Sequence, residues 1–419
     1  MKIVTINNSD SIGGAAIVAR RLNDALNSMG VEATMLVINS SNSDATGVKP
    51  FGNKLRSKWN FLYERLVIFM RNRFSRKNLF KVSIANTGYD LSRHPDLLDA
   101  DIIILNWINQ GVMSLKHIEQ LATLNKPVVS VLHDLWFATG ICHHPYECTR
   151  FANICHSCGY LKSNSKNDLS TTIFKRKRDL CDKLDIQFVA VSNWVKRRCS
   201  QSALLSSHSV EVIHNAFPIQ SFSYERRIAD KSLNIPINRR ILVMGAARLD
   251  DPIKGFDIMI AAMNHISESD PVLASKIHLV LYGNIRNREL LKQIKIPFTY
   301  LGVINGVEEI AKVYSYSDIV LSTSLYETLG GTLIEGQAAG CIPVSFGEGG
   351  QADIVEHLKS GYIAQYKSPE SIADGIRWAL ESNLSRKELH DWVKERFSQE
   401  QIAKRYMQLF HKLINERNN

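Results

Sequence analysis

Short runs of apolar, often β-branched residues recur along the whole chain, and most of them do not alternate with polar residues. In the first half these runs cover residues 3–7, 34–38, 101–106, 127–132, 187–191 and 211–213. In the second half they cover residues 240–245, 278–283, 298–301, 318–323 and 342–346. Continuous apolar runs of this length predict strands that are buried on both faces of a sheet.

Amphipathic helical patterns lie between these runs, for example at 14–29, 308–314 and 332–339. Strands that alternate with helices indicate parallel, doubly wound sheets. The alternation pauses once, in a stretch with two prolines and a charged, Ser-containing segment, and then restarts with a strong strand. We therefore predict two Rossmann-like domains, a linker and a C-terminal helix that packs back toward the first domain. Their bounds are 1–216, 217–238 for the linker, 239–390, and 391–419 for the helix.

Length and composition agree with this organisation. The 419 residues suffice for two or three domains at about 100–200 residues each. Apolar residues make up 45% and charged residues 22%, values that are typical of globular proteins and exclude disordered, collagen-like and coiled-coil chains. The first residues read as a strand and not as a signal peptide, and no apolar run approaches the ~18 residues of a membrane span. Seven cysteines without a signal favour the reducing cytosol over a disulfide scaffold.

Doubly wound sheets bind ligands beyond the carboxyl ends of their strands, and two such domains facing across a cleft would hold a ligand in that cleft. A nicotinamide cofactor requires G-x-G-x-x-G after the first strand. The turn here reads Ser11-Ile12-Gly13-Gly14-Ala15-Ala16, which lacks that spacing. An oxidoreductase that binds a dinucleotide is therefore disfavoured.

The second half carries an acidic motif, Glu327-Thr328-Leu329-Gly330-Gly331-Thr332-Leu333-Ile334-Glu335, between a predicted strand and a predicted helix. Two glycines at a helix start let backbone N–H groups approach a phosphate. Glu335 lies about one turn into the helix, where a carboxylate suits a vicinal diol such as a ribose, and Glu327 lies in the preceding loop. Taken alone, the motif also fits a capped helix with two solvated acids.

A basic loop follows an earlier strand of the same half. Its segment, Gly245 to Gly255, contains Arg248 and Lys254. An Arg can bind a phosphate through two N–H groups and a Lys acts as a point charge, so the pair can neutralise a diphosphate without a metal. The alternative is two ordinary surface cations.

Together, the two motifs resemble the signature of the large retaining glycosyltransferase family with the GT-B fold, known as glycosyltransferase family 4 or group 1. Further segments that fit the family pattern are Gly13-Gly14, Val189-Ala190-Val191-Ser192-Asn193, Val212-Ile213-His214-Asn215, Gly347-Glu348-Gly349-Gly350 and Asp353-Ile354-Val355. The resemblance covers nearly the whole chain. It departs from the common pattern by one extra residue between Arg248 and Lys254 and by Leu329 in place of an aromatic residue. Both changes affect loop geometry, and neither removes a charged group.

The resemblance implies a metal-independent transferase that keeps the anomeric configuration of the sugar. It implies that Glu335 binds the ribose of a nucleotide-sugar donor and that Glu327 is a catalytic residue at the donor sugar. The donor diphosphate would be held by two cations, Arg248 and Lys254, and by backbone N–H groups at glycines that allow close approach: Gly13, Gly14, Gly330 and Gly331. His133 would line the catalytic cleft near the donor sugar, although alone it also fits a core or capping histidine. Asp134 either orients His133 or caps the next segment.

Four cysteines lie close together in a segment at about 140–160: Cys142, Cys148, Cys155 and Cys158. The spacing of Cys155 and Cys158 suits tetrahedral zinc, whereas that of Cys142 and Cys148 is looser than zinc ribbons prefer. A comparable insertion is found in a subgroup of the resembling family related to colanic acid transferases. A structural zinc that braces the loop after His133 and free thiols are the two alternatives. No cofactor is expected in catalysis.

The net charge of +10 is concentrated in residues 54–81, which carry nine cations and one anion, while the other 391 residues contribute +2. Apolar residues are interleaved, and Leu62, Leu66, Phe69 and Arg73 share one predicted helix face. This pattern predicts a basic amphipathic helix on an anionic membrane surface, or else a helix packed on the first domain with a solvated cationic face. No recognition motif accompanies the patch, so a nucleic-acid partner is not expected.

The sequence thus predicts a cytoplasmic enzyme that is peripheral at the inner face of the membrane. It would extend a capsule, O-antigen or exopolysaccharide, with a glycan or a lipid-linked oligosaccharide as acceptor. The alternatives are an inactive carbohydrate- or lipid-binding GT-B scaffold, a sugar-nucleotide epimerase and a phosphorylase, of which the last is disfavoured by the chain's length.

Overall fold

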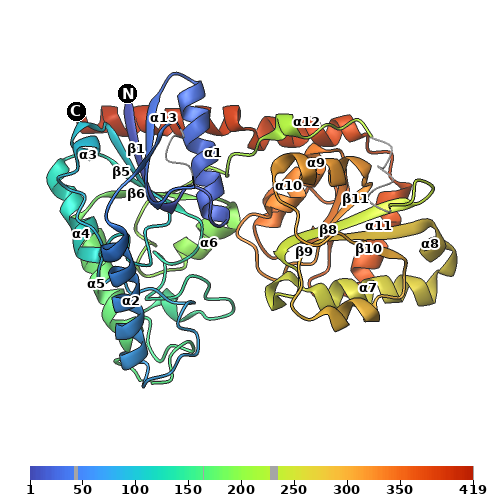
Figure 1. Cartoon of the computed structure of the whole chain (residues 1–419), viewed down its shortest axis with the longest axis horizontal. Coiled ribbons are helices and arrows are strands. Elements are labelled where there is room, and N and C mark those ends of the chain that lie inside the picture. Colours follow the sequence, from blue (N-terminus) through green and yellow to red (C-terminus); the bar gives the residue numbers. More distant parts are fainter. Residues whose placement is uncertain (42–45, 164, 227–234, 419) are drawn as a thin grey trace. The chain divides into compact units, whose positions relative to one another are not determined.

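The computed structural model describes residues 1–41, 46–163, 165–226 and 235–418. They form two α/β units (Figure 1). The first unit comprises Met1–Ala216 and Ile402–Asn419, and the second comprises Phe217–Gln401. Residues 217–238, expected to be a linker, are counted with the second unit, and 227–234 lie outside the described residues.

The first unit contains a sheet of seven strands in the order β3-β2-β1-β4-β5-β6-β7. Every neighbouring pair is parallel, as in the register of Ile3 with Ala33 of β2 and with Ile102 of β4. The strands are β1 (Lys2–Ser9), β2 (Glu32–Asn39), β3 (Val48–Pro50), β4 (Ile102–Leu105), β5 (Val128–Leu132), β6 (Ile186–Ala190) and β7 (Val210–Val212). All residues of β4 and β5 are buried, which confirms the interpretation of apolar runs without alternation.

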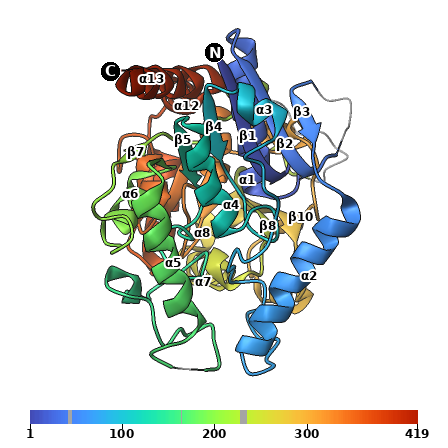
Figure 2. The same ribbon diagram turned by 90° about the vertical axis from the view of Figure 1, so that its left-hand side faces the viewer.

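The helices of the first unit connect these strands. They are α1 (Gly14–Ser28), α2 (Lys54–Arg71), α3 (Pro95–Asp99), α4 (Leu115–Glu119), α5 (Leu169–Lys183) and α6 (Asn193–Ser200), with short 3-10 helices η1 (Gln120–Leu124) and η2 (Arg150–Ala152). The sequence pattern missed β3, because this edge strand has three residues and only Val48 is buried. Figure 2 shows the strands of this sheet side by side, with α2 at the periphery of the unit.

The second unit contains a parallel six-stranded sheet in the order β10-β9-β8-β11-β12-β13. The strands are β8 (Arg240–Arg248), β9 (Ile277–Asn284), β10 (Phe298–Tyr300), β11 (Ile319–Ser322), β12 (Ile342–Phe346) and β13 (Tyr362–Ala364). Both sheets have the doubly wound, Rossmann-like form that the sequence predicts. Only β13 was missed in this unit, since it has three residues and one of them is buried.

Helices cover both faces of the second sheet (Figure 1). The apolar sides of α7 (Phe256–Ser269) and α11 (Pro369–Glu381) share one core with strands β8, β9, β11 and β12. The other helices are α8 (Pro271–Lys276), α9 (Val307–Tyr316) and α10 (Gly331–Ala338), with the 3-10 helices η3 (Ile219–Ser221), η5 (Pro252–Lys254), η6 (Arg288–Gln293) and η7 (Gly350–Asp353).

The prediction of one C-terminal helix over residues 391–419 is wrong in its number of helices and in its start. Two helices are present, α12 (Arg386–Phe397) and α13 (Gln399–Asn418), and Ser398 between them has an extended backbone. Within the first unit, Arg417 of α13 donates a hydrogen bond from Nη2 to Asn125 Oδ1 at 3.1 Å. Among the helices that the structure describes, none has the length and apolarity needed to cross a membrane.

Candidate functional site

The acidic and basic motifs of the second unit meet through one ion pair. Lys254 ends the 3-10 helix η5, and Glu327 lies in the loop between β11 and α10. Lys254 Nζ and Glu327 Oε2 are 2.7 Å apart, and both side chains are half-buried. The fold therefore brings together two of the residues that the sequence assigned to the donor diphosphate and the donor sugar.

Backbone contacts hold these two loops against each other. Thr323 Oγ1 donates to the carbonyl oxygens of Lys254 and Gly255, at 3.0 and 2.8 Å, and Leu325 N donates to Ile253 O at 2.7 Å. Gly255 has a φ of 59°, and a Cβ atom there would lie 2.2 Å from Thr323 O. Only glycine allows so close an approach, so Gly255 fixes the distance between the two loops.

We expect Gly255→Ala to lower the free energy of unfolding by about 2–4 kcal/mol, because the new Cβ forces the loops apart and alanine disfavours a positive φ. Chemical denaturation measures this change. Gly302→Ala is the matched control, since Gly302 also has a positive φ, 71°, but a Cβ atom added there would meet no other atom within 4 Å. Equal losses in the two variants would contradict the role of the close approach.

Arg248, at the end of β8, is held on its own loop and not by Glu327. Its guanidinium pairs with Asp250 Oδ1 at 3.4 Å and with Asp251 Oδ2 at 3.1 Å. Asp250 Oδ2 in turn accepts from the backbone N–H groups of Arg286 and Asn287, both at 2.9 Å. Burial raises the pKa of Asp250, but these N–H donors and the charge of Arg248 outweigh it and lower the pKa below its ordinary value. Asp250 therefore positions Arg248, a role that the sequence pattern did not reveal.

The two predicted glycines begin α10. Gly330 is the N-cap with a φ of 105° and no side-chain cap, and Leu333 N in the first turn donates to Gly330 O at 3.0 Å. The N–H groups that begin a helix have no partner further back in it, so they can meet an outside acceptor. A Cβ atom at Gly330 would lie 3.6 Å from Glu327 Cγ, and Gly350 N donates to Glu327 O at 2.9 Å. Gly331 follows at the first helical position. The helix start and the Lys254–Glu327 pair are therefore neighbours, an arrangement suited to an anion.

Glu335 lies one turn along α10 and is half-buried. Burial raises the pKa of both Tyr282 and Tyr314, and the charge of Glu335 raises it further. The hydroxyl oxygens of these two tyrosines are 2.7 Å apart. Sequence reasoning missed this tyrosine pair, because one residue lies on a strand and the other on a helix 32 residues later.

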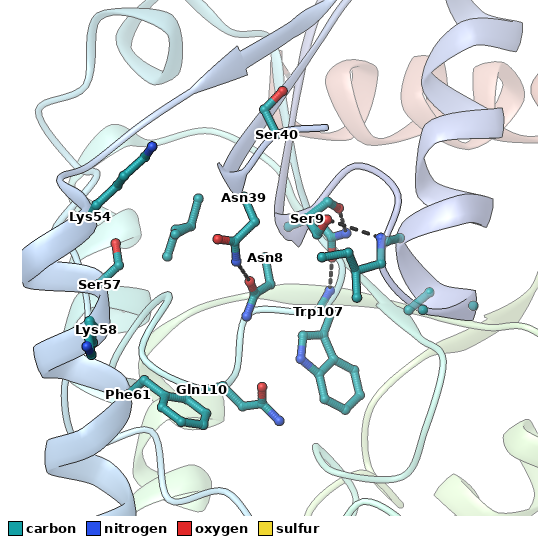
Figure 3. Close-up of a pocket in the computed structure, with 17 residues that line it drawn as sticks. Asn8, Ser9, Asn39, Ser40, Lys54, Ser57, Lys58, Phe61, Trp107 and Gln110 are labelled. Carbon is teal, nitrogen blue, oxygen red and sulfur yellow. Dashed lines mark hydrogen bonds between the residues drawn. The ribbon is translucent and has the colours of Figure 1, made fainter. Parts of the chain in front are cut away.

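The first unit contains a cavity of about 980 Å³ at the carboxyl ends of β1 and β2. Gly13 and Gly14, which begin α1, are exposed and line it. Figure 3 shows Lys54, Ser57, Lys58 and Phe61 of α2 on one side, facing Asn8 and Asn39. Asn39 Nδ2 donates to Asn8 Oδ1 at 2.8 Å. The predicted N-terminal glycine turn and the start of the basic segment therefore border the same cavity.

His133 follows β5 and is held by Asn106, which follows β4. His133 Nε2 donates to Asn106 Oδ1 at 2.7 Å. Burial lowers the pKa of His133 to about 4, although Asp134 opposes this, so the imidazole is neutral at neutral pH. Asn106 was not identified from the sequence, although its position after a buried strand was a usable signal.

Asp134 is bonded to the segment that follows it. Its Oδ1 accepts from Trp136 N at 2.7 Å, and its Oδ2 lies 2.8 Å from His143 Nδ1. Burial raises the pKa of Asp134, but His143 and the Trp136 N–H lower it below its ordinary value. Of the two roles considered for Asp134, capping the next segment matches the hydrogen bonds that the structure describes.

The four clustered cysteines differ in exposure. Cys142 is buried, Cys155 and Cys158 are half-buried, and Cys148 is exposed. Cys155 Sγ accepts from Gly140 N at 3.2 Å. Among the described residues, no group of three or more His, Cys, Asp or Glu side chains is arranged to hold a metal ion. The residues as placed do not fit a zinc ion, and the structural zinc stays a prediction.

Lys177 of α5 is fully buried beneath this loop. Its Nζ donates to Thr139 O at 3.0 Å and to Trp136 O, and it lies 3.4 Å from the centre of the Trp136 ring. Burial lowers its pKa to about 7, against the opposing effect of nearby thiols such as Cys142. The burial of Lys177 could have been predicted from the sequence, because it shares the apolar helix face of Ile173, Leu180 and Cys181.

Alkylation of the native protein tests the zinc prediction. We expect Cys148 to react with iodoacetamide first, because it is exposed, and Cys142 to react only after unfolding, because it is buried. Mass spectrometry of the labelled peptides measures both. Near-stoichiometric zinc, together with a Cys148 that reacts only after treatment with a chelator, would show instead that the cluster binds zinc.

Comparison with known proteins gives a family match within the second unit. Residues 225–397 match the family described as glycosyl transferases group 1. The match covers most of the second unit, which is therefore similar to a glycosyltransferase group 1 domain. An uncharacterised glycosyltransferase of Methanocaldococcus jannaschii is 23% identical over 365 residues, which are 80% of this chain and 90% of that protein. A glycogen synthase of Mycoplasma mobile is 24% identical over 198 residues, 43% of this chain and 40% of that enzyme.

Solved structures of glycosyltransferases share the fold of nearly the whole chain, including both units. A structure of Anabaena HepE, determined with UDP and glucose, superposes with a TM-score of 0.63 and 18% identity over 98% of this chain and 99% of that one. Sucrose-phosphate synthase of Thermosynechococcus elongatus gives a TM-score of 0.64 with 16% identity, over 99% and 100% of the two chains. The fold is GT-B, as predicted.

Proposed function

We propose that this chain is a retaining glycosyltransferase of the family 4 type, which transfers a hexose from a nucleotide-sugar donor to a growing surface polysaccharide. The Lys254–Glu327 ion pair beside the start of α10, inside the segment that matches glycosyl transferases group 1, carries this proposal. This part of the second unit combines a cation for the leaving group, Lys254, a carboxylate for the sugar, Glu327, and backbone N–H groups of α10 for a phosphate. These are the groups that glycosyl transfer from a diphosphate requires.

On the donor side, negative charge grows on the diphosphate as the bond from C1 of the sugar to the phosphate oxygen breaks. Lys254, Arg248 and the N–H groups at Gly330 and Gly331 stabilise that charge without a metal. Gly13 and Gly14 leave backbone N–H groups accessible to a phosphate in the same way. Glu335 accepts hydrogen bonds from the ribose hydroxyls.

In the step itself, an acceptor hydroxyl attacks C1 on the face from which the diphosphate departs. The C1–O bond to the acceptor forms as the C1–O bond to the diphosphate breaks, and the hydroxyl proton passes to the departing phosphate oxygen. The products are the glycosylated acceptor, with the anomeric configuration retained, and a nucleoside diphosphate. Glu327 orients the sugar and stabilises its positive charge. In the first unit, His133 is the further candidate catalytic residue, and its neutral imidazole can donate or accept a hydrogen bond.

We propose that the acceptor is a lipid-diphosphate-linked glycan and that the enzyme is cytoplasmic and peripheral at the inner face of the membrane. The cavity of the first unit supports this choice. Its volume of about 980 Å³ suits a glycan of more than one sugar, and Lys54 and Lys58 on its wall suit a phosphate.

A donor screen tests the proposal. UDP-sugars, GDP-sugars and the other nucleotide sugars are added in turn and the shift in Tm is measured, followed by release of nucleoside diphosphate. UDP-sugars come first because a structure of HepE contains UDP-glucose. One donor class should raise Tm and be hydrolysed slowly without acceptor. No response to any nucleotide would contradict the transferase.

The screen also separates the competing functions. An inactive scaffold would raise Tm with a donor and release no nucleoside diphosphate. A sugar-nucleotide epimerase would convert the donor to its epimer without an acceptor. The presence of Arg248, Lys254, Glu327 and Glu335 together favours the transferase.

A further inference from the structure

Helix α2 packs on the first unit through polar side chains. Its buried residues are Asn60, Glu64, Arg65 and Ile68, of which only the last is apolar. Glu64 is fully buried, and its Oε2 pairs with Arg65 Nη2 at 2.7 Å. Its Oε1 accepts from the N–H groups of Ile84 and Ala85, at 2.8 and 2.9 Å. A network of hydrogen bonds therefore fixes which side of α2 faces the protein.

The rest of this network anchors the helix at both sides of Glu64. Arg65 Nη1 donates to Val82 O at 3.0 Å and also to Leu79 O. Asn60 Oδ1 accepts from Thr87 Oγ1 at 2.9 Å. These hydrogen bonds tie Asn60, Glu64 and Arg65 to backbone and side-chain groups of residues 79–87, so α2 has little freedom to rotate about its axis.

The opposite side of α2 carries a stripe of exposed apolar residues, which we call the outer stripe: Leu55, Trp59, Leu62, Leu66 and Met70. Their spacing of four, three, four and four residues places them on one helix face. They are between 46% and 80% exposed. An apolar face is ordinarily the buried one, so the amphipathicity of α2 is inverted.

Cations surround the outer stripe. Of the nine in residues 54–81, only Arg65 is buried, and it is neutralised by Glu64. The other eight are exposed, and none of them forms an ion pair with a described residue: Lys54, Arg56, Lys58, Arg71, Arg73, Arg76, Lys77 and Lys81. Phe74 and Phe80, just past the helix, are 71% and 63% exposed and extend the apolar surface among these charges.

We propose that the outer stripe and the six of these cations that do not line the cavity of the first unit form the face that docks this protein onto an anionic lipid bilayer, with α2 lying in the interface. The proposal deepens the proposed function and rests on it for the membrane-linked acceptor. Apolar side chains enter the acyl boundary, while the flanking cations meet anionic headgroups. A partner must be both negatively charged and apolar to cover this face, and a bilayer surface offers both.

Helix α2 also links the docking face to the cavity of the first unit. Residues on the flank of the same helix line the cavity of the first unit: Lys54, Ser57, Lys58 and Phe61 (Figure 3). One helix thus presents one side to the bilayer and another to the cavity. A lipid-linked acceptor that emerges from the bilayer beside α2 enters this cavity without leaving the membrane.

Vesicle flotation of the full chain, without donor or acceptor, tests the docking face. We expect the protein to float with phosphatidylcholine vesicles that contain phosphatidylglycerol, and to bind vesicles of phosphatidylcholine alone at least about tenfold less. Raising the salt concentration from about 0.1 M to about 1 M should weaken binding to the anionic vesicles, because the Debye length falls from about 10 Å to about 3 Å.

The decisive variant replaces three residues of the outer stripe, Trp59→Ser, Leu62→Ser and Leu66→Ser. We expect it to lose at least about tenfold in binding to the anionic vesicles. The matched control replaces Leu98, Val272 and Leu358 with Ser; these are 51–64% exposed, compared with 48–64% for the test set. Circular dichroism and Tm confirm that both variants fold. Equal binding by the two variants, or no binding by the wild type, would overturn the proposal.

Two further measurements separate the alternatives. Trp59 emission should be quenched by lipids brominated in the acyl chain, and Trp59→Phe should remove that part of the quenching. If the wild type is a dimer that does not bind vesicles, and the stripe variant is a monomer, the face binds a second copy of the chain and the bilayer proposal is wrong. Because flotation needs no donor, failure to bind vesicles and failure to respond to nucleotide sugars are independent results.

Discussion

Glu327→Gln should lower kcat by about 10²–10³-fold while donor binding survives, because the amide keeps the shape of the side chain and removes its charge. In the structure, that charge lies 2.7 Å from Lys254 Nζ and next to Gly330, the N-cap of α10. Glu327 would stabilise the positive charge of the sugar in the transition state, whereas the donor is held mainly by other residues. The release of nucleoside diphosphate gives kcat, and calorimetry gives the Kd of the donor.

Glu309→Gln is the matched control for this variant. Glu309 is also paired with a lysine, Lys312, but both side chains of this pair are exposed on α9. We expect no change in kcat for this control. A Glu327→Gln enzyme with wild-type turnover would remove Glu327 from the catalytic residues.

Lys254→Ala should produce a comparably large effect, with turnover lowered by about 10²-fold and a weaker affinity for the donor. The variant removes one cation from the diphosphate and also leaves the half-buried Glu327 carboxylate without its partner. Steady-state kinetics over a range of donor concentrations separates kcat from KM. Arg248→Ala should lower turnover less than Lys254→Ala, because Arg248 pairs with Asp250 and Asp251 and its loss leaves the Lys254–Glu327 pair in place.

A double-mutant cycle sharpens the test of Lys254. If Lys254 and Glu327 act as one unit, the combined variant should lose much less activity than the product of the two single losses. Lys292→Ala is the control, since Lys292 pairs with Glu289 at 2.8 Å on the surface of η6. Fully multiplicative losses would show that the ion pair is not part of the mechanism.

Much of the second unit could be anticipated from the sequence because its motifs follow directly after strands. In a parallel sheet the carboxyl ends of neighbouring strands meet at one edge, so loops after β8 and β11 must lie together. The family resemblance assigned Lys254 and Glu327 to one donor site, where the structure has them 2.7 Å apart. The sequence could not reveal Asp250 as the anchor of Arg248, because that anchor depends on backbone N–H groups of a loop 36 residues later.

The basic segment was the part most altered by the structure. Its helix was expected to share Leu62, Leu66, Phe69 and Arg73 on one face, but α2 ends at Arg71, and Arg73 follows it with a φ of 51°. Leu62 and Leu66 do share a face, and that face is directed outward. Periodicity shows that a helix has two unlike sides and does not say which of them packs inward.

The sequence by itself determined the strand pattern, the parallel sheets, the donor motifs and the location of the excess charge, since each of these depends on residues close together in the chain. The tertiary structure decided which side of α2 is buried, because Glu64 is satisfied there by the N–H groups of residues 20 and 21 positions away. It also decided that Asn106 holds His133 and that His143 pairs with Asp134. Buried polar groups take whichever partners the folded chain brings within reach, and no local pattern specifies them.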